Sequence, residues 1–318
     1  MPAVQYVVEG GSKLRGSIRP SGNKNAALPI VAAALISENP VHLDNVPRIR
    51  DLETLVELIR STGAEIQWTG QNSLDIHAKE VHSRQLDPAL CARIRASILL
   101  AAPLLHRCGE ITLPPPGGDV IGRRRLDTHF LALEQLGAKV RVDDKFHLTA
   151  SGFTGADVFL DEPSVTATEN ALVAAAAAKG VTILRNAASE PHVQDLAQFL
   201  ITLGARIEGV GTNTMTVHGG ESIGSKAVSH TIGPDHIEVG SFIGLAAVTK
   251  SELRIEKAGI KEFLPPLDEF SSLQLGPDAL VVGKPYDGPA DTEPSHIVRN
   301  VGTLKNLAEA MERCFAPA

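Results

Sequence analysis

The chain has little of what marks secreted, membrane-spanning or disulfide-linked proteins. Its three cysteines, Cys91, Cys108 and Cys314, are odd in number and widely spaced, which favours unpaired thiols over a disulfide framework. Its longest apolar run, residues 171–178, is far too short to span a bilayer. Residues 1–11 lack the basic and then apolar regions of a secretory signal. We therefore expect a cytoplasmic protein without membrane association.

An excess of positive charge is also lacking. The chain has 30 Lys and Arg against 37 Asp and Glu, a net charge of −7. Aromatic residues make up only 4% of it, and no basic stripe with interleaved aromatics is present, so no nucleic-acid partner is predicted. Any anionic ligand must be held by local clusters of cations, because the overall field is unfavourable. With 318 residues, 43% of them hydrophobic, the chain is long enough for two cores.

What the sequence does contain is a repeat with a period of about 70 residues, the kind of regularity that indicates an architecture before any local assignment. Three helix-like stretches end in Gly-Ala followed by a charged and a β-branched residue, at Gly63, Gly137 and Gly204. Glycine suits the left-handed position just after a helix end. Each unit is predicted as helix, strand, helix, strand, turn, strand. The matching segments are the small-residue helices 26–36, 94–105 and 168–179, the strands 41–43, 111–113 and 181–184, and the strand pairs 65–68 with 73–77, 139–142 with 146–149 and 206–208 with 214–218.

A fourth unit begins on schedule and is not completed. A small-residue helix is predicted over 238–248 and a strand over 253–255. The expected long helix, 262–275, is interrupted by two consecutive prolines, which a helix interior does not tolerate. The remaining predicted segments are a worn strand at 279–282, a Pro/Gly-rich connector to about residue 294, and an amphipathic helix over 304–314.

The first of two cationic loops, residues 21–25, precedes the first small-residue helix. Lys24 beside the backbone donors of a helix start predicts a seat for a phosphate group. The alternative is a polar helix cap with a solvated lysine.

The second cationic loop, residues 114–127, opens with three prolines, continues with Gly117 and Gly118, and then carries three consecutive arginines at 123–125. The prolines stiffen the approach, and the glycines let backbone N–H groups face a ligand closely. Guanidinium groups offer a two-pronged fork to phosphate oxygens, so the loop indicates a phosphate or diphosphate clamp. The alternative is an exposed basic helix start.

These features together resemble the UDP-N-acetylglucosamine 1-carboxyvinyltransferases, a family of enolpyruvyl transferases. The resemblance covers about residues 6–260 and implies an α/β fold, the inside-out α/β barrel of βαβαββ repeats with its helices packed inward. It predicts one complete three-repeat domain, 22–231, and an incomplete second domain formed by 1–21 and 232–318. The motifs that carry it are SGNKNAAL at 21–28, RASIL at 95–99, PGGDVIGRRRLDTH at 116–129, SVTATEN at 164–170 and GPDHIEVGSF at 233–242.

The resemblance also implies a reaction. In this family the enolpyruvyl group of phosphoenolpyruvate is transferred to the 3′-hydroxyl of UDP-N-acetylglucosamine with release of phosphate, the first committed step of peptidoglycan precursor synthesis. The implied partners are these two small-molecule substrates, with no metal and no organic cofactor. We expect a monomer, with self-association if the second domain is incomplete.

Site residues are implied position by position. Lys24 and Asn25 match the phosphoenolpyruvate contacts, and Arg95 matches a nucleotide-sugar contact. Arg124 matches the arginine that serves the phosphates. Simple helix capping is an alternative role for Ser164 and for Thr166. The residues implied to shape the uridine pocket are Arg124, Arg125, Leu126, Asp127, Thr128, Ser164 and Val165.

Asp119 stands where most family members carry a cysteine that protonates C3 of the enol ether, and where some members carry aspartate. A carboxyl must be protonated to act as an acid, whereas three nearby arginines favour its ionised form. The hypothesis is that bound phosphate and carboxylate groups offset the arginine charge and raise the pKa of Asp119 only in the substrate complex.

The C-terminal third departs from the family pattern. Family members supply an aspartate and further arginines from the second domain, and those arginines have no counterpart here. Asp291 follows Pro289 and Ala290 in a context similar to the family's aspartate, and is a candidate base. An alternative reading is a non-catalytic, truncated paralogue that binds the UDP-sugar without turning it over. The shikimate-pathway sibling is a third reading, which the nucleotide-side motifs do not favour.

Overall fold

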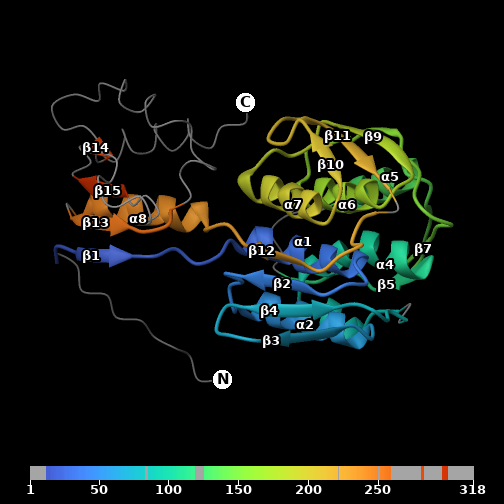
Figure 1. Cartoon of the computed structure of the whole chain (residues 1–318), viewed down its shortest axis with the longest axis horizontal. Coiled ribbons are helices and arrows are strands. Elements are labelled where there is room, and N and C mark those ends of the chain that lie inside the picture. Colours follow the sequence, from blue (N-terminus) through green and yellow to red (C-terminus); the bar gives the residue numbers. More distant parts are fainter. Residues whose placement is uncertain are drawn as a thin grey trace. The chain divides into compact units, whose positions relative to one another are not determined.

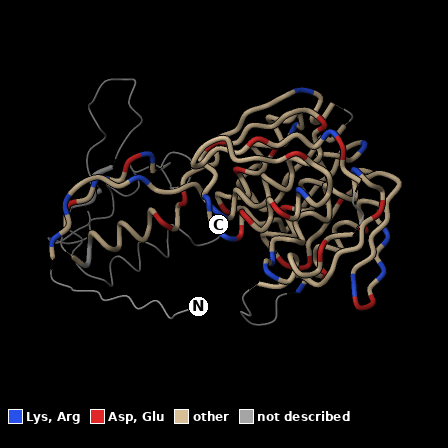
Figure 2. The backbone as a smooth tube through the Cα atoms, turned by 90° about the horizontal axis from the view of Figure 1, so that it is seen from below, with Lys and Arg blue, Asp and Glu red and all other residues tan. Residues whose placement is uncertain are grey.

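The computed structural model describes residues 12–82, 85–118, 125–220, 222–249, 251–258, 281–282 and 296–299. The chain divides into two compact units (Figure 1), one formed by residues 22–233 and the other by residues 1–21 with 234–318. Acidic and basic residues are interspersed along the described chain (Figure 2). Among the described helices, none combines the length and apolar character needed to cross a bilayer.

The unit 22–233 contains the three predicted repeats, and the first is completed by a strand from the far end of the unit. Its sheet has the order β12-β2-β4-β3, in which β12 pairs in parallel with β2. The sequence did not reveal β12. The elements are α1 (Lys24–Ala33), the 3₁₀ helix η1 (Ala34–Ile36), β2 (Val41–Asp44), α2 (Arg50–Ser61), β3 (Glu65–Trp68), β4 (Leu74–His77) and β12 (Val228–Thr231).

The second repeat forms a sheet of order β5-β7-β6. Its small-residue helix was predicted as one element over 94–105, but the structure divides it into η2, a 3₁₀ segment, and α4. An α-helix starting at Arg95 would need the missing N–H of Pro103, whereas in α4 this proline falls in the first turn, where no N–H is required. The elements are α3 (Pro88–Cys91), η2 (Arg95–Leu100), α4 (Ala101–Cys108), β5 (Glu110–Leu113), α5 (Asp127–Gln135), β6 (Lys139–Val142) and β7 (Phe146–Thr149).

The third repeat forms a sheet of order β8-β9-β11-β10, in which the unpredicted β8 pairs in parallel with β9. The elements of this repeat are β8 (Asp157–Phe159), α6 (Val165–Ala176), β9 (Gly180–Arg185), α7 (Pro191–Thr202), β10 (Arg206–Glu208) and β11 (Thr214–Gly219).

Across the three repeats, the predicted bounds of β3, β6, β7 and β10 are confirmed residue for residue.

The small-residue helices lie inside and the sheets outside. Every residue of α1 from Ala26 to Ala33 is buried, as is every residue of α6 from Ala167 to Ala176. Figure 1 shows both helices between the strands of the first and third repeats. Alanine allows this, because a helix with short side chains on all faces can be surrounded closely. In the described residues the strands form separate sheets and not one continuously hydrogen-bonded barrel.

The three Gly-Ala positions end the second helix of each repeat as expected. Gly63, Gly137 and Gly204 have φ values of 102°, 102° and 115°. A residue with a side chain would be strained in this backbone conformation. Each glycine N–H donates to the carbonyl three residues earlier, and the alanine that follows each is buried. A small residue is therefore needed after the glycine so that the chain can turn into the next strand against the core.

The other unit contains a sheet of order β1-β13-β15-β14 and the helix α8. The predicted helix and the strand at 253–255 are confirmed, whereas β15 was not predicted. The predicted helices 262–275 and 304–314, and Asp291, lie outside the described residues. The elements are β1 (Arg15–Ile18), α8 (His236–Val248), β13 (Glu252–Ile255), β14 (Val281–Val282) and β15 (His296–Arg299).

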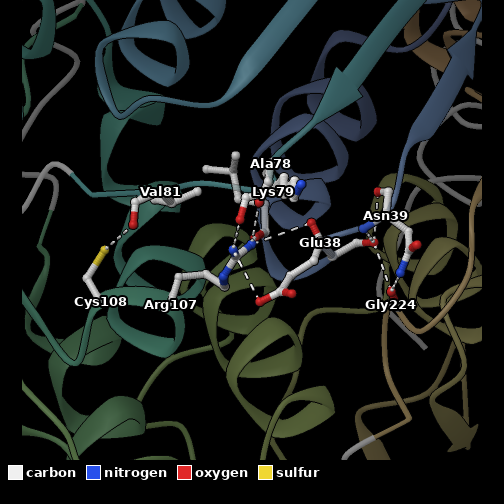
Figure 3. A network of polar contacts seen from close by, with 10 residues as sticks. Glu38, Asn39, Ala78, Lys79, Val81, Arg107, Cys108 and Gly224 are labelled. Carbon is white, nitrogen blue, oxygen red and sulfur yellow. Dashed lines mark hydrogen bonds and ion pairs between the residues drawn. The ribbon is translucent and has the colours of Figure 1, made fainter.

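Arg107, at the end of α4, joins the first two repeats (Figure 3). Its guanidinium donates to the carbonyl oxygens of Leu35 at 2.8 Å, Ala78 at 2.8 Å and Lys79 at 3.1 Å. It also lies 3.6 Å from the carboxylate of Glu38. Only 10% of the Arg107 side chain is exposed, and Leu35 and Ala78 are buried, whereas Lys79 is exposed. The guanidinium therefore satisfies backbone acceptors at the end of η1 and just after β4.

Candidate functional site

A cavity of about 470 Å³ lies within the unit 22–233, at the starts of the small-residue helices. The first residues of α1, η2 and α6 line it, and so do early residues of α2 and α7. Backbone N–H groups at helix starts lack intrahelical partners and carry partial positive charge. Helix starts from all three repeats thus meet at one cavity, an arrangement that favours anionic ligands.

Lys24 and Asn25 bring the first repeat to the cavity. The Asn23 side chain caps α1, since its Oδ1 accepts hydrogen bonds from the N–H groups of Asn25 at 2.8 Å and Ala26 at 3.2 Å. The ammonium group of Lys24 lies 2.6 Å from an Asp51 carboxylate oxygen. The polar cap is therefore present, but Lys24 is held in place by Asp51 and is not simply solvated. Sequence reasoning missed Asp51, which is indistinguishable from any acidic residue in the first turn of a helix.

Arg95 brings the second repeat to the cavity as the first residue of η2. Its guanidinium donates to the carbonyl oxygen of Arg125 at 3.0 Å. Arg93, two residues earlier, also lines the cavity and lies 3.4 Å from Glu57. Among the described residues, two arginines and one lysine therefore line the cavity.

Gly117 and Gly118 lead toward the cavity, with different roles from those expected. The N–H of Gly117 donates to the carbonyl of Cys91 at 2.9 Å, so it does not face a ligand. A Cβ on Gly117 would lie 1.8 Å from the carbonyl oxygen of Ala92, which explains the need for glycine. Gly118, with φ of 87°, does line the cavity. Asp119 and Arg124, both predicted site residues, lie outside the described residues.

The run after this loop is held by its own acidic neighbours. The Arg125 guanidinium donates to both carboxylate oxygens of Asp127, at 2.9 and 2.8 Å, and to Asp161 at 3.0 Å. The hydrogen bonds that Arg125 donates to Asp127, and then the charge of Asp127, raise the pKa of Arg125. Thr128 is buried and donates to Asp161 at 2.6 Å. None of these residues is in the described lining of the cavity, nor is Leu126, so their role at a uridine pocket stays a prediction.

The start of α6 brings the third repeat to the cavity. Ser164 caps the helix, with its hydroxyl accepting from the N–H of Ala167 at 3.4 Å, and it is not in the cavity lining. Val165 and Thr166 line the cavity, as does Glu169 one turn further along. The structure thus brings together Lys24, Asn25, Arg95 and Val165 from the predicted set.

Two further residues were missed by sequence reasoning. Glu169 is only 2% exposed and lies within the SVTATEN motif, where it reads as an ordinary helix residue. His192, the second residue of α7, is buried and also lines the cavity. Nothing in the spacing of either residue points to the cavity, because their approach depends on how α6 and α7 pack.

The buried thiol of Cys91 is not in the described lining of the cavity. Burial raises the pKa of the Cys91 thiol to about 11, which leaves it protonated and unreactive at neutral pH. Within the described residues, no cluster of three His, Cys, Asp or Glu side chains is placed to bind a metal ion. The described lining of the cavity includes cations, helix starts, the Asp51 carboxylate, His192 and the buried carboxyl group of Glu169.

The fold is shared with enolpyruvyl transferases. The family model described as EPSP synthase (3-phosphoshikimate 1-carboxyvinyltransferase) matches residues 8–264, and the chain belongs to this family. The enolpyruvyl transferase NikO from Streptomyces tendae has the same fold, with a TM-score of 0.73 and 27% identity over 91% of this chain and 66% of its own. An EPSP synthase from Acinetobacter baumannii shares the fold with a TM-score of 0.68 at 18% identity, over 92% of this chain and 66% of its own.

Two relatives with similar sequences carry the same name. A UDP-N-acetylglucosamine 1-carboxyvinyltransferase from Bradyrhizobium diazoefficiens is 70% identical over 82% of this chain and 60% of its own length. The enzyme of the same name from Treponema denticola is 48% identical over 86% of this chain and 63% of its own length. The chain thus spans about three fifths of the length of these relatives.

Proposed function

We propose that this protein transfers the enolpyruvyl group of phosphoenolpyruvate to the 3′-hydroxyl of UDP-N-acetylglucosamine, with release of phosphate, in the cytoplasmic synthesis of peptidoglycan precursors. The observation that carries the proposal is the meeting of Lys24, Arg95 and Val165, from three different repeats, at one cavity. The 70% identity to a relative named for this reaction supports the same substrates.

The chemistry requires protonation of C3 of phosphoenolpyruvate while the sugar oxygen attacks C2, followed by loss of phosphate and of a C3 proton. Lys24 and Arg95 neutralise substrate anions, and the helix starts add partial positive charge. We assign the proton donor to Asp119, the position at which the family uses an acid. Substrate binding in the cavity would orient the two reactants and displace competing water.

The first test is binding. UDP-N-acetylglucosamine is expected to bind the wild-type protein in calorimetry, and Arg95→Ala is expected to weaken that binding by about 10- to 100-fold, because a hydrogen bond to a charged group contributes roughly 1.5–3 kcal/mol. Lys24→Ala is expected to weaken phosphoenolpyruvate binding to the same degree. The matched control is Arg141→Ala on β6, a 70% exposed arginine paired with Asp143, which should leave both affinities unchanged.

The second test is turnover. Phosphate release that requires both substrates would establish the transferase. Thermal stabilisation by UDP-N-acetylglucosamine without any phosphate release would contradict the proposal, and would favour a protein that binds the UDP-sugar without converting it.

A further inference from the structure

A chain of buried hydrogen bonds leads to Thr166 at the cavity and determines which atom carries each proton. It begins at Asn170, which is 1% exposed. Its Oδ1 accepts from the N–H of Ala102 at 3.2 Å, and its Nδ2 donates to the carbonyl of Ile98 at 3.0 Å. Because a backbone N–H can only donate and a carbonyl can only accept, these two contacts establish the orientation of the Asn170 amide.

The orientation of Asn170 in turn determines the tautomer of His129. The Asn170 Nδ2 lies 2.9 Å from His129 Nδ1, so Nδ1 must accept and carries no proton. Burial, and then the charge of Arg95, lower the pKa of His129 to about 3, which keeps the ring neutral. The single ring proton is therefore on Nε2, which lies 3.0 Å from the hydroxyl oxygen of Thr166 and donates to it. The hydroxyl proton of Thr166 is left to point elsewhere, and Thr166 lines the cavity.

Glu169 lies one helical turn after Thr166, on the same face of α6, and also lines the cavity. Its side chain is 2% exposed, and within the described residues its Oε1 has no hydrogen-bond partner. Burial, and then the Glu190 carboxylate, raise the pKa of Glu169 well above its ordinary range. An unpaired buried carboxyl group is costly, so a partner from outside the protein would relieve a real deficit.

The charged and titratable groups around this wall come from every element that borders the cavity. They are Lys24 on α1, Asp51 on α2, Arg93 and Arg95 at η2, His129 on α5, Glu190 just before α7, and His192 on α7. Among them, the Glu190 carboxylate is the one that acts on the Glu169 carboxyl group alongside burial.

We propose that Thr166 and Glu169 form a hydrogen-bond-donating subsite for an anionic oxygen, phosphate or carboxylate, of a substrate in the cavity. The inference rests on the proposed function and adds hydrogen-bond donors to the cationic residues that line the same cavity. A neutral carboxylic acid can donate to such an oxygen, whereas an ionised carboxylate would repel it. The threonine hydroxyl adds a second donor, because its oxygen accepts from His129 and its proton does not point toward that ring.

Calorimetry at pH 7 with phosphoenolpyruvate, UDP-N-acetylglucosamine and inorganic phosphate tests the subsite. Thr166→Val and Glu169→Leu remove the donors with little change in shape, and each is expected to weaken binding of at least one probe by about 5- to 100-fold. Glu169→Gln keeps a donor and should bind nearly as the wild type does. The probe whose binding is weakened identifies the source of the anionic oxygen: phosphoenolpyruvate, the diphosphate of the UDP-sugar, or free phosphate.

A pH series supplies the second readout. As pH rises through the pKa of Glu169, wild-type affinity should fall, whereas Glu169→Gln should keep its affinity. The pH dependence of urea unfolding without ligand should also report the raised pKa of Glu169. Because the folded state holds this proton above the ordinary glutamate pKa, the unfolding equilibrium constant of the wild type should rise relative to Glu169→Gln by up to about tenfold per pH unit.

The outcomes are separable. If the wild type fails to bind the UDP-sugar and phosphoenolpyruvate, the proposed function fails. If it binds both, and Thr166→Val and Glu169→Leu bind every probe equally well, the subsite is overturned. Loss of binding by Glu169→Gln to the level of Glu169→Leu would also overturn it, because the donor would then not be the feature that matters.

Discussion

Asp119→Asn is expected to slow phosphate release in a single turnover by ~10²–10⁴-fold, the usual contribution of a placed proton donor. Asparagine matches aspartate in shape but cannot transfer a proton to C3 of phosphoenolpyruvate. Rapid-quench measurement with both substrates at saturation isolates this step from binding. Affinity for UDP-N-acetylglucosamine, measured on the same variant, should stay close to that of the wild type.

Asp119→Cys is the matched control for this prediction. A thiol can also donate a proton, and cysteine is the residue that most of the family carries at this position, so activity should survive with a different pH profile. The wild-type rate should fall at alkaline pH, where Asp119 loses the proton that it donates. Equal rates for wild type and Asp119→Asn would remove Asp119 from the mechanism.

Arg107→Ala is expected to lower the free energy of unfolding by about 3–4 kcal/mol, an effect at the upper end for a single substitution. The change leaves the carbonyls of two buried residues, Leu35 and Ala78, without this donor, whereas the Lys79 carbonyl belongs to an exposed residue. Urea unfolding followed by circular dichroism measures the loss. The free energy of unfolding of Arg107→Lys should lie between those of the wild type and Arg107→Ala, because a single ammonium group cannot reach all three acceptors.

Arg206→Ala provides the comparison for Arg107. Arg206 is 74% exposed and pairs with Glu208 on the same strand, so its removal should cost no more than about 0.5 kcal/mol. Glu38→Gln should also cost little, because the Glu38 side chain is 72% exposed. If Arg107→Ala were no more destabilising than Arg206→Ala, the three carbonyls would have to find water, and the guanidinium would not join the repeats.

Local signals predicted the repeat well. The glycines at 63, 137 and 204 announce helix ends because a left-handed residue is needed there, and the alternating residues at 65–68, 139–142 and 206–208 announce half-buried strands. The strands β8 and β12 were missed for a different reason. Each is three or four residues long and gains its hydrogen bonds from a distant partner, so its own sequence carries little pattern.

The site shows the same division. The motifs predicted Lys24, Arg95 and Val165 as site residues, and all three line the cavity. The pairing of Lys24 with Asp51, and the position of Glu169 on the cavity wall, could not be read from the motifs. Those contacts join residues on different helices, and the distance between such residues depends on packing.

By itself, the sequence determined the three-fold repeat and the identity of the cationic groups, because periodicity, glycine and charge are properties of short segments; the inward packing of the helices was implied only by the family resemblance. Only the tertiary structure decided that helix starts from three repeats share one cavity and that Asn170 determines the tautomer of His129. It also decided that Glu169 lines that cavity with an Oε1 atom that has no hydrogen-bond partner among the described residues. Burial and hydrogen-bond orientation arise when distant segments meet in space, and no single segment contains that information.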